Sequence, residues 1–353
     1  MTVTSEEPVV VCRNVWKIFG ERADEAMKAV EARNLSKAEV LAEFGCVVGV
    51  RDVSIEVGEG EVFCIMGLSG SGKSTLVRHI NRLIEPTSGD IIINGTNVGK
   101  LNAEELRVMR ADNIGMVFQN MALLPHRTVS DNIAFALELR KVDAFTRAQL
   151  AEKVIETVDL QGYGDRLPSE LSGGMQQRVG LARALAADPD ILLMDEPFSA
   201  LDPLIRRGLQ DEFLALSRDL KKTTLFITHD LDEAIRMGNR IAIMKDGEIV
   251  QVGTPEDIVT QPADKYVADF VAGISKLKLI FAHTVMQPVA EYEAKVKKLP
   301  ALRNCPQAGT EDDLDTLVGL SINQDKPVVI MDDGKAVGVV TKDALLRGIQ
   351  GEA

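Results

Sequence analysis

The stretch GLSGSGKST at residues 67–75 constrains the fold of this chain more than any other part of the sequence. It follows the apolar run VFCIM, which is short enough to be a buried strand, and it opens a segment that is typical of a helix. Gly67, Gly70 and Gly72 free the backbone, so that consecutive N–H groups can point at phosphate oxygens beside the positive end of the helix. Strand, loop and helix together predict a phosphate-binding site in an α/β fold.

Two side chains of this loop predict its chemistry. Lys73 would neutralise the β and γ phosphates of a nucleotide, and the hydroxyl of Ser74 would bind magnesium. The alternative is a glycine-rich turn that fits the pattern by accident, and the complete match after a strand argues against it. The residues expected to surround the phosphates are Gly67, Leu68, Ser69, Gly70, Ser71, Gly72, Lys73, Ser74 and Thr75.

Two carboxylates follow a second apolar run, in ILLMDEP at residues 191–197. Since the ligands of a mostly parallel sheet gather at the carboxyl ends of its strands, Asp195 and Glu196 are expected beside the phosphates. Asp195 suits magnesium, and Glu196 suits the base that orients the attacking water or accepts its proton. By itself, an acidic pair after a strand is more often a helix cap or a solvated turn.

Gln119 and His229 follow two further apolar runs, IGMVF and TLFIT. Both are therefore expected at the sheet edge that carries Asp195. Gln119 has a donor and an acceptor for magnesium or water, and His229 is expected to contact the γ-phosphate or the attacking water. A lone histidine is more often structural, and its position at a strand end is what favours the catalytic interpretation.

A second glycine-rich helix start, LSGGMQQ, lies at residues 171–177. Ser172 can cap this helix while Gly173 and Gly174 allow backbone N–H groups to approach an oxyanion, with Gln176 close behind them. The segment thus predicts a second anion site, and a plain capped helix is the alternative.

The bulk composition is that of a folded protein. The chain has 353 residues, 45% of them hydrophobic, and its formal net charge of -13 argues against bulk attraction to nucleic acid. No stretch approaches the roughly 20 apolar residues that a membrane helix needs. The four cysteines have neither metal-site nor disulfide spacing. We expect a protein of a reducing cytoplasm whose membrane role depends on a partner.

Helix caps and turn residues along the chain predict its domain organisation. The polar, alanine-rich stretch 21–45 predicts a helix, with a capping box that begins at Ser36 and a stop at Gly45. A helix capped by Thr254 is expected to lead to the end of the first domain near Gly273. Further along, KPVVIMDDGKAVGVV predicts a strand pair, and TKDALLRGI after it predicts a helix. The expected domains are residues 1–273, with a helical insertion at about 21–45 and a helical subdomain at about 120–180, and residues 276–353.

Taken in order, GLSGSGKST, Gln119, LSGGMQQ, ILLMDEP, SALD at 199–202 and His229 resemble the ATPase subunit of an ABC transporter, over roughly residues 9–272. The resemblance implies an α/β P-loop NTPase fold of ABC type, with a mixed sheet and a helical subdomain. It also implies that ATP and magnesium lie between two copies of the chain packed head to tail, each phosphate loop closed by the other copy's LSGG. Asp202 then belongs to the loop that meets its symmetry mate, and Phe19 takes the place of the aromatic side chain that stacks on adenine.

The insertion at 21–45 and the sequence around the phosphate loop resemble the ATPase subunits of importers for glycine betaine, proline betaine and choline. This resemblance implies permease subunits as partners, a periplasmic or lipid-anchored substrate-binding protein reached through the complex, no nucleic acid, and a peripheral place on the cytoplasmic face of the membrane. The segment MALLPHRTV at 121–129 is where the permease would dock, with core packing as the alternative.

The tail resembles a single CBS module, a small α/β regulatory unit, with HTVMQP near its start and KPVVIMDDGKAVGVVTKDALL after it. Related importers commonly carry two such modules, so this tail is expected to pair with the tail of the second chain. Thr341 and Asp343 match positions that hold adenosine ribose in nucleotide-binding CBS modules, and a purely structural tail is the alternative. The basic run KVKKLPALR at 295–303 is expected either to approach anionic lipid or to be a solvated face.

The sequence leaves several functions open. The leading one is ATP hydrolysis that powers uptake of glycine betaine or a related osmoprotectant, and an importer ATPase for a different amino acid would share its motifs. A soluble ABC ATPase acting on ribosomes or DNA is disfavoured by the charge of -13 and by the lack of a second ATPase domain or a long coiled coil. A sensor that only binds ATP would not need Glu196 and His229.

Overall fold

A computed structural model of the chain describes residues 8–199, 201–272, 277, 279–295, 304–322, 324–332 and 334–350. The chain divides into two compact units, Met1–Val252 and Gly253–Ala353. The domain end predicted near Gly273 lies outside the described residues, as does nearly all of the basic run 295–303. The division into residues 1–273 and 276–353 therefore stays a prediction.

The larger unit is built on two sheets. The four-stranded sheet has the order β2-β1-β4-β5, its neighbouring strands run antiparallel, and it consists of β1 (Val10–Phe19), β2 (Val47–Val57), β4 (Ser88–Ile93) and β5 (Thr96–Asn97). The six-stranded sheet has the order β10-β9-β3-β8-β7-β6 and consists of β3 (Val62–Met66), β6 (Ile114–Val117), β7 (Ile191–Asp195), β8 (Thr223–Thr228), β9 (Arg240–Lys245) and β10 (Glu248–Gly253). The pairs β9-β3, β3-β8, β8-β7 and β7-β6 are parallel, which confirms the predicted α/β fold with a mixed sheet arrangement.

The central strands of the six-stranded sheet bring the predicted site residues to one edge. Every residue of β3, β7 and β8 is buried, as expected for parallel strands covered on both faces. Met66 at the end of β3 lies opposite Thr228, and Asp195 at the end of β7 lies opposite Ile227. The segments that follow these strands therefore begin side by side.

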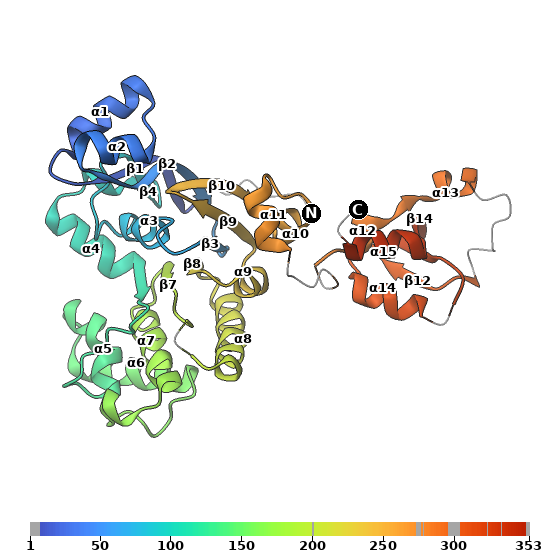
Figure 1. The fold of residues 1–353 in the computed structure, drawn as a ribbon. Coiled ribbons are helices and arrows are strands. Elements are labelled where there is room, and N and C mark those ends of the chain that lie inside the picture. The colour runs from blue at the N-terminus through green and yellow to red at the C-terminus, as the bar shows by residue number, and fades with distance from the viewer. Residues whose placement is uncertain are drawn as a thin grey trace. The chain divides into compact units, whose positions relative to one another are not determined.

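Helices cover the sheets and form a separate cluster. The helices of this unit are α1 (Ala23–Arg33), α2 (Lys37–Phe44), α3 (Lys73–Ile80), α4 (Ala103–Asn113), α5 (Val129–Leu139), α6 (Ala144–Thr157), α7 (Gly173–Leu185), α8 (Pro203–Leu220) and α9 (Leu231–Met237). α5, α6 and α7 pack on one another around Ile133, Ile155 and Val179, which belong to a core of their own (Figure 1).

The stretch 21–45, which was predicted to be helical with a capping box at Ser36 inside it, consists of two helices, α1 and α2. Asn34 ends α1 in the left-handed conformation, with φ 50°, which explains the break. Ser36 begins α2 with the predicted capping box, in which its hydroxyl accepts the N–H of Glu39. Gly45 ends α2 in the left-handed conformation, as predicted.

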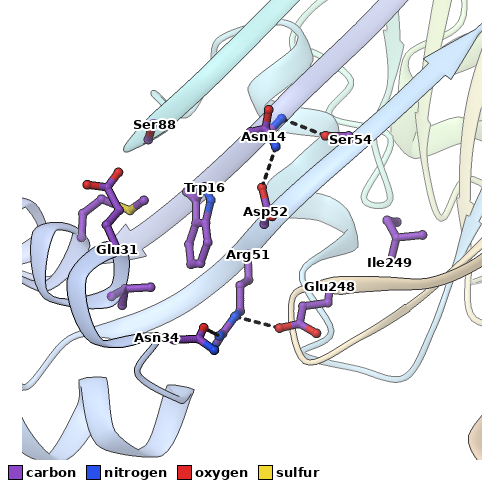
Figure 2. A pocket seen from close by; sticks show the side chains of 12 residues that line it. Asn14, Trp16, Glu31, Asn34, Arg51, Asp52, Ser54, Ser88, Glu248 and Ile249 are labelled. Atoms are coloured by element: carbon purple, nitrogen blue, oxygen red, sulfur yellow. Dashed lines mark hydrogen bonds and ion pairs between the residues drawn. The ribbon is translucent and has the colours of Figure 1, made fainter.

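Arg51 of β2 fastens this insertion to both sheets. Its guanidinium donates to the carbonyl oxygen of Leu35 and to Oδ1 of Asn34, each at 3.0 Å, and its Nε pairs with Glu248 of β10 at 2.8 Å (Figure 2). The same guanidinium lies 5.6 Å from the centroid of the Trp16 ring. A cavity of about 790 Å³ is lined by Trp16, Asn34, Arg51 and Glu248, among others, and contains no residue of the phosphate loop.

The smaller unit has a four-stranded sheet of order β11-β14-β13-β12. Its strands are β11 (Gln287–Pro288), β12 (Gln307–Gly309), β13 (Val328–Asp332) and β14 (Lys335–Val340), and its helices are α10 (Pro255–Thr260), α11 (Lys265–Val271), α12 (Ala282–Val285), α13 (Val289–Lys295), α14 (Leu314–Ser321) and α15 (Lys342–Gln350). The cap at Thr254 and the predicted strand pair and helix are confirmed. Among the helices of the described residues, none combines the length and the apolar character needed to cross a bilayer.

Candidate nucleotide-binding site

The phosphate loop has a backbone that favours glycine at three of its positions. Gly67 has φ 154°, Gly70 has φ 78° and Gly72, the residue before α3, has φ 104°. A β-carbon on Gly72 would lie 2.3 Å from the carbonyl oxygen of Gly49, so the loop packs directly against β2. The helix that follows leaves its first N–H groups without intrahelical partners, which suits an anion.

Lys73 is buried within this loop. Its ammonium donates to the carbonyl oxygen of Gly67 at 2.8 Å and to that of Leu68 at 3.0 Å. Burial lowers the pKa of Lys73, while the carboxylates of Glu196 and Asp195 act in the opposite direction. The loop thus places a cation next to both predicted carboxylates.

Asp195 links the end of β7 to the first turns of α3. Its carboxylate is buried, and Oδ1 accepts a hydrogen bond from Ser74 Oγ at 2.7 Å. Oδ2 pairs with Nη2 of Arg78 at 3.1 Å. Arg78 was not among the predicted site residues, although it lies four residues after Ser74, a spacing that places two side chains on one face of a helix.

Glu196 is the point at which three predicted residues meet. Nε2 of Gln119 donates to Oε2 of Glu196 at 3.2 Å, and Nδ1 of His229 lies 3.1 Å from the same oxygen. The three residues follow β6, β7 and β8, which are neighbours in the sheet. A carboxylate held from two sides in this way can orient a water molecule and accept its proton.

These side chains share a cavity of about 680 Å³ with the phosphate loop. Phe19 at the end of β1 lines it, and the Lys17 ammonium lies 5.1 Å from the centroid of its ring. The lining residues are Phe19, Lys37, Val47, Val48, Gly49, Leu68, Ser69, Gly70, Gly72, Lys73, Ser74, Thr75, Gln119, Glu196 and His229. Four of these lining residues were not predicted from the sequence: Lys37, Val47, Val48 and Gly49. The pairing of β1 with β2, which puts Phe19 opposite Val47, brings the β2 residues there.

Ser71 provides an independent test of whether a phosphate fits this loop. Its side chain is buried, and Oγ has no hydrogen-bond partner within the described ranges. Such an atom is uncommon in folded proteins, and a bound anion with its hydration would satisfy it. The oxygens of Ser74, Gln119 and Asp195 are the hard donors that magnesium prefers. The residues therefore fit a phosphate chain with its metal ion.

The predicted second anion site lies outside this cavity. Ser172 caps α7 as predicted, with Oγ accepting the N–H of Met175 at 3.4 Å. Neither Ser172 nor the two glycines after it line the cavity of the phosphate loop. A single chain therefore does not bring the two glycine-rich segments together in one cavity.

The two glycines at the start of α7 have different surroundings. A β-carbon on Gly174 would lie 2.9 Å from Cγ2 of Ile205 on α8, so close helix packing accounts for this glycine. A β-carbon on Gly173 would meet no atom within 4 Å in the described part of the chain. Contacts among those residues therefore do not explain Gly173.

Two other predicted residues have structural partners near this helix start. Nε2 of Gln176 donates to the carbonyl oxygen of Pro168 at 3.0 Å, which secures the turn before α7. Asp202 caps α8, with Oδ1 accepting the N–H of Leu204 at 3.0 Å. Asp202 does not line the phosphate-loop cavity either.

Comparison with known proteins agrees with this geometry. The profile of the ABC transporter family matches residues 50–199. The glycine betaine/proline betaine transport system ATP-binding protein ProV of Salmonella typhimurium is 47% identical over 333 residues, which cover 94% of this chain and 80% of that protein. The trimethylamine N-oxide transport system ATP-binding protein TmoW of Ruegeria pomeroyi is 46% identical over 340 residues, which cover 96% of each chain.

Among solved structures, a dimeric ATP-binding cassette in a post-hydrolysis state with ADP and Pi has a similar fold. It is 31% identical, with a TM-score of 0.59, and the match covers 70% of this chain and 98% of that chain. The stretch that matches the family profile contains the phosphate loop, Gln119, the start of α7 and the carboxylates after β7. The chain belongs to the ATP-binding subunits of ABC transporters.

Proposed function

We propose that this chain hydrolyses ATP to power the import of glycine betaine or a related osmoprotectant, such as proline betaine or choline. The observation that carries the catalytic part is the convergence of Gln119 and His229 on one oxygen of Glu196, in the cavity that also contains the phosphate loop. The cargo assignment rests on relatives named as transport proteins for glycine betaine, proline betaine and trimethylamine N-oxide, small osmolytes with a methylated nitrogen.

Within this cavity the nucleotide has defined partners. Phe19 stacks on the adenine, and the backbone of the phosphate loop surrounds the phosphates with Lys73 beside them. Ser74, Gln119 and Asp195 would hold magnesium, which would supply positive charge for the phosphate oxygens. The pair formed by Ser74 Oγ and Asp195 Oδ1 supports this assignment, because it already joins two of the three donors.

Glu196 provides the proton acceptor in the proposed mechanism. Its carboxylate orients a water molecule toward the γ-phosphorus and receives a proton of that water as it attacks, while the bond from that phosphorus to the bridging oxygen breaks and ADP leaves. Gln119 fixes the carboxylate from one side, and His229 fixes it from the other. His229, whose side chain is 57% exposed, also reaches the open part of the cavity, where it can donate to a γ-phosphate oxygen.

The proposed active form is a head-to-tail pair of chains. Ser172, Gly173 and Gly174 lie outside the phosphate-loop cavity of their own chain, and the open space at Gly173 fits close approach by the nucleotide of a second copy. Leu68 in the phosphate loop and Leu204 after the Asp202 cap are 59% and 82% exposed. Exposed leucines at both places suit surfaces that become covered when two chains pack together.

A groove beside the α5–α7 cluster is the proposed docking site for a permease subunit. It has a volume of about 530 Å³ and is lined by Phe118, Leu124, Phe135 and Leu139, with Arg183 among its polar residues. The segment predicted to dock, 121–129, contributes two of its lining residues, Ala122 and Leu124. Such a groove fits a short helix from the cytoplasmic side of a membrane subunit, which would hold this chain at the cytoplasmic face. The substrate-binding protein would contact the permease.

The smaller unit is proposed to contain a single CBS module within residues 276–353. The sheet β11-β14-β13-β12 with α14 and α15 supports this assignment. Thr341 begins α15, and its Oγ1 accepts the N–H of Ala344 at 3.2 Å. Asp343 lies in the first turn of the same helix. Since the hydroxyl of Thr341 already caps a helix, dimer pairing is the role we assign to the module.

Transport in a defined membrane tests the proposal. The chain is reconstituted with the permease and binding protein of a glycine betaine importer, in vesicles that hold ATP and magnesium, and uptake of labelled glycine betaine is measured against choline and proline. We expect ATP-dependent uptake of glycine betaine that is lost with Lys73→Ala. Uptake restricted to proline would contradict the cargo, and ATP-independent uptake would contradict the coupling.

A further inference from the structure

Arg206, in the second turn of α8, joins two loops of the site. Its Nη2 donates to the carbonyl oxygen of Leu201 at 3.1 Å, immediately before the Asp202 cap. Its Nη1 contacts Oδ2 of Asp230 at 3.5 Å, and its Nε lies 3.7 Å from Oε1 of Glu233. One guanidinium therefore connects the loop before α8 to the segment that contains His229.

The carboxylate of Glu233 holds the segment that contains His229 through two hydrogen bonds. Its side chain is buried, Oε2 accepts a hydrogen bond from Thr228 at 2.6 Å, and Oε1 accepts one from Gln210 of α8 at 3.0 Å. Asp230 caps α9, with Oδ1 accepting the N–H of Glu233, and its own backbone N–H donates to Thr228 Oγ1. The residues on both sides of His229 are thus fixed to α8.

This network contains a buried carboxylate, that of Glu233, and a buried guanidinium nitrogen without a hydrogen-bond partner, Nε of Arg206. Burial raises the pKa of Glu233, and Arg206 is the cation that the structure pairs with it. Nε of Arg206 is buried and has no hydrogen-bond partner within the described ranges. An unpaired buried donor reduces the contribution of this arginine to the free energy of unfolding. A buried polar group with incomplete partners in a native structure needs an explanation, and a role in function is one such explanation.

We infer that Arg206 is a positioning residue for ATP hydrolysis, which couples the placement of His229 to the loop that ends at Asp202. The inference rests on the proposed function, in which His229 faces the nucleotide of its own chain and Asp202 faces the partner chain. The planar guanidinium bonds the carbonyl oxygen of Leu201 and the carboxylate of Asp230 and forms an ion pair with Glu233, a geometry that the single ammonium of lysine does not reproduce. Movement of either loop is therefore transmitted to the other through one side chain.

The test uses steady-state ATPase assays of the full-length chain, with nucleotide affinity measured by a fluorescent ADP analogue. Arg206→Met is expected to lower kcat at least tenfold and to leave the affinity for the analogue within twofold, because Arg206 does not line the nucleotide cavity. Arg206→Lys is expected to retain an intermediate kcat. The matched control is Arg82→Met, which removes an arginine of similar burial that bonds two carbonyls and Glu85, and kcat should stay within twofold.

The double variant Arg206→Met with Glu233→Gln separates positioning from charge neutralisation. If Arg206 only neutralises Glu233, removing both charges restores kcat, and the inference is overturned. We expect the double variant to regain thermal stability while kcat stays low. The ring resonance of His229 should move in Arg206→Met and not in Arg82→Met, and an unmoved resonance would also overturn it. A wild-type chain without ATPase activity would contradict the proposed function instead.

Discussion

At the scale of single residues, Glu196 lies at the proposed catalytic position and has an energetically unfavourable backbone conformation. It adopts the left-handed conformation with φ 47° and precedes Pro197, although a residue before proline is normally extended. Such a conformation costs on the order of 1–3 kcal/mol. Its N–H bonds the carbonyl oxygen of Ile227 at 3.1 Å, and Gln119 and His229 hold its side chain. These contacts aim the carboxylate away from the strand direction and into the cavity.

Replacing Glu196 by glutamine removes the proton acceptor with little change in shape. We expect kcat to fall about 10²–10⁴-fold, since a general base contributes in that range. ATP binding should persist and the ATP-bound pair of chains should accumulate, as seen by size-exclusion chromatography with light scattering. Glu31→Gln, on the exposed rim of the cavity in Figure 2, is the matched control. Hydrolysis at the parental rate in Glu196→Gln would show that another group is the base.

His79, near the end of α3, makes folding stability depend on pH. Its ring is buried, with Nδ1 2.7 Å from the carbonyl oxygen of Ile84, and burial lowers its pKa below that of an unfolded chain. The unfolded state therefore binds the proton more tightly, so this contribution to stability is present above a pH of about 6.5 and is lost as the pH falls. His79→Asn keeps a donor for Ile84 and cannot be protonated. Melting temperatures from about pH 7.5 to 5.5 should decline more steeply for the wild type, and parallel curves would contradict this.

Sequence patterns predicted most of the site because strand ends determine it. The apolar runs predicted that Asp195 and His229 would lie at one sheet edge, and parallel pairing produces that result. Arg78 and Lys37 were missed for a different reason. Their positions depend on long-range packing, of Arg78 against β7 and of the insertion near Phe19, which local periodicity does not report.

At the scale of elements, the start of α7 shows how one helix serves two surfaces. Gly174 faces Ile205 of α8 within the chain, and Gly173 faces open space. The LSGG sequence predicted a capped helix correctly, since Ser172 caps it. It did not show that the two glycines have different roles, because that difference depends on where α8 lies. The insertion is similar: the caps at Ser36 and Gly45 were predictable, and the break at Asn34 was not.

Alanine at each glycine separates the two roles. Gly174→Ala forces α7 and α8 apart, so the free energy of unfolding should fall by about 1–3 kcal/mol. Gly173→Ala should leave stability within about 0.5 kcal/mol of the wild type, because nothing within the described residues opposes a β-carbon there. It should nevertheless lower kcat about tenfold or more, by blocking the approach of the partner's nucleotide. Denaturant titration with ATPase assays measures both, and full activity of Gly173→Ala would contradict the proposed second anion site.

At the scale of the whole molecule, the proposed pairing of the tails should strengthen the dimer. Removing all residues after 275 is expected to raise the dissociation constant of the ATP-bound pair, measured by analytical ultracentrifugation. Since the smaller unit begins at Gly253, a second cut after Val252 removes α10 and α11 as well and serves as the comparison. An unchanged equilibrium after the first cut would mean that the module does not pair.

The separation of Lys73 from Ser172 within one chain has a genetic consequence. Homodimers of Lys73→Ala and homodimers of Ser172→Arg should both be inactive, since every ATP would meet one damaged half. In a cell that expresses both alleles, each mixed dimer has two nucleotide sites. In one site the altered Lys73 position faces the altered Ser172 position, and in the other site both residues are wild type. The two alleles should therefore complement each other in part, and purified mixed dimers should recover up to about half of the wild-type turnover if the two sites act independently.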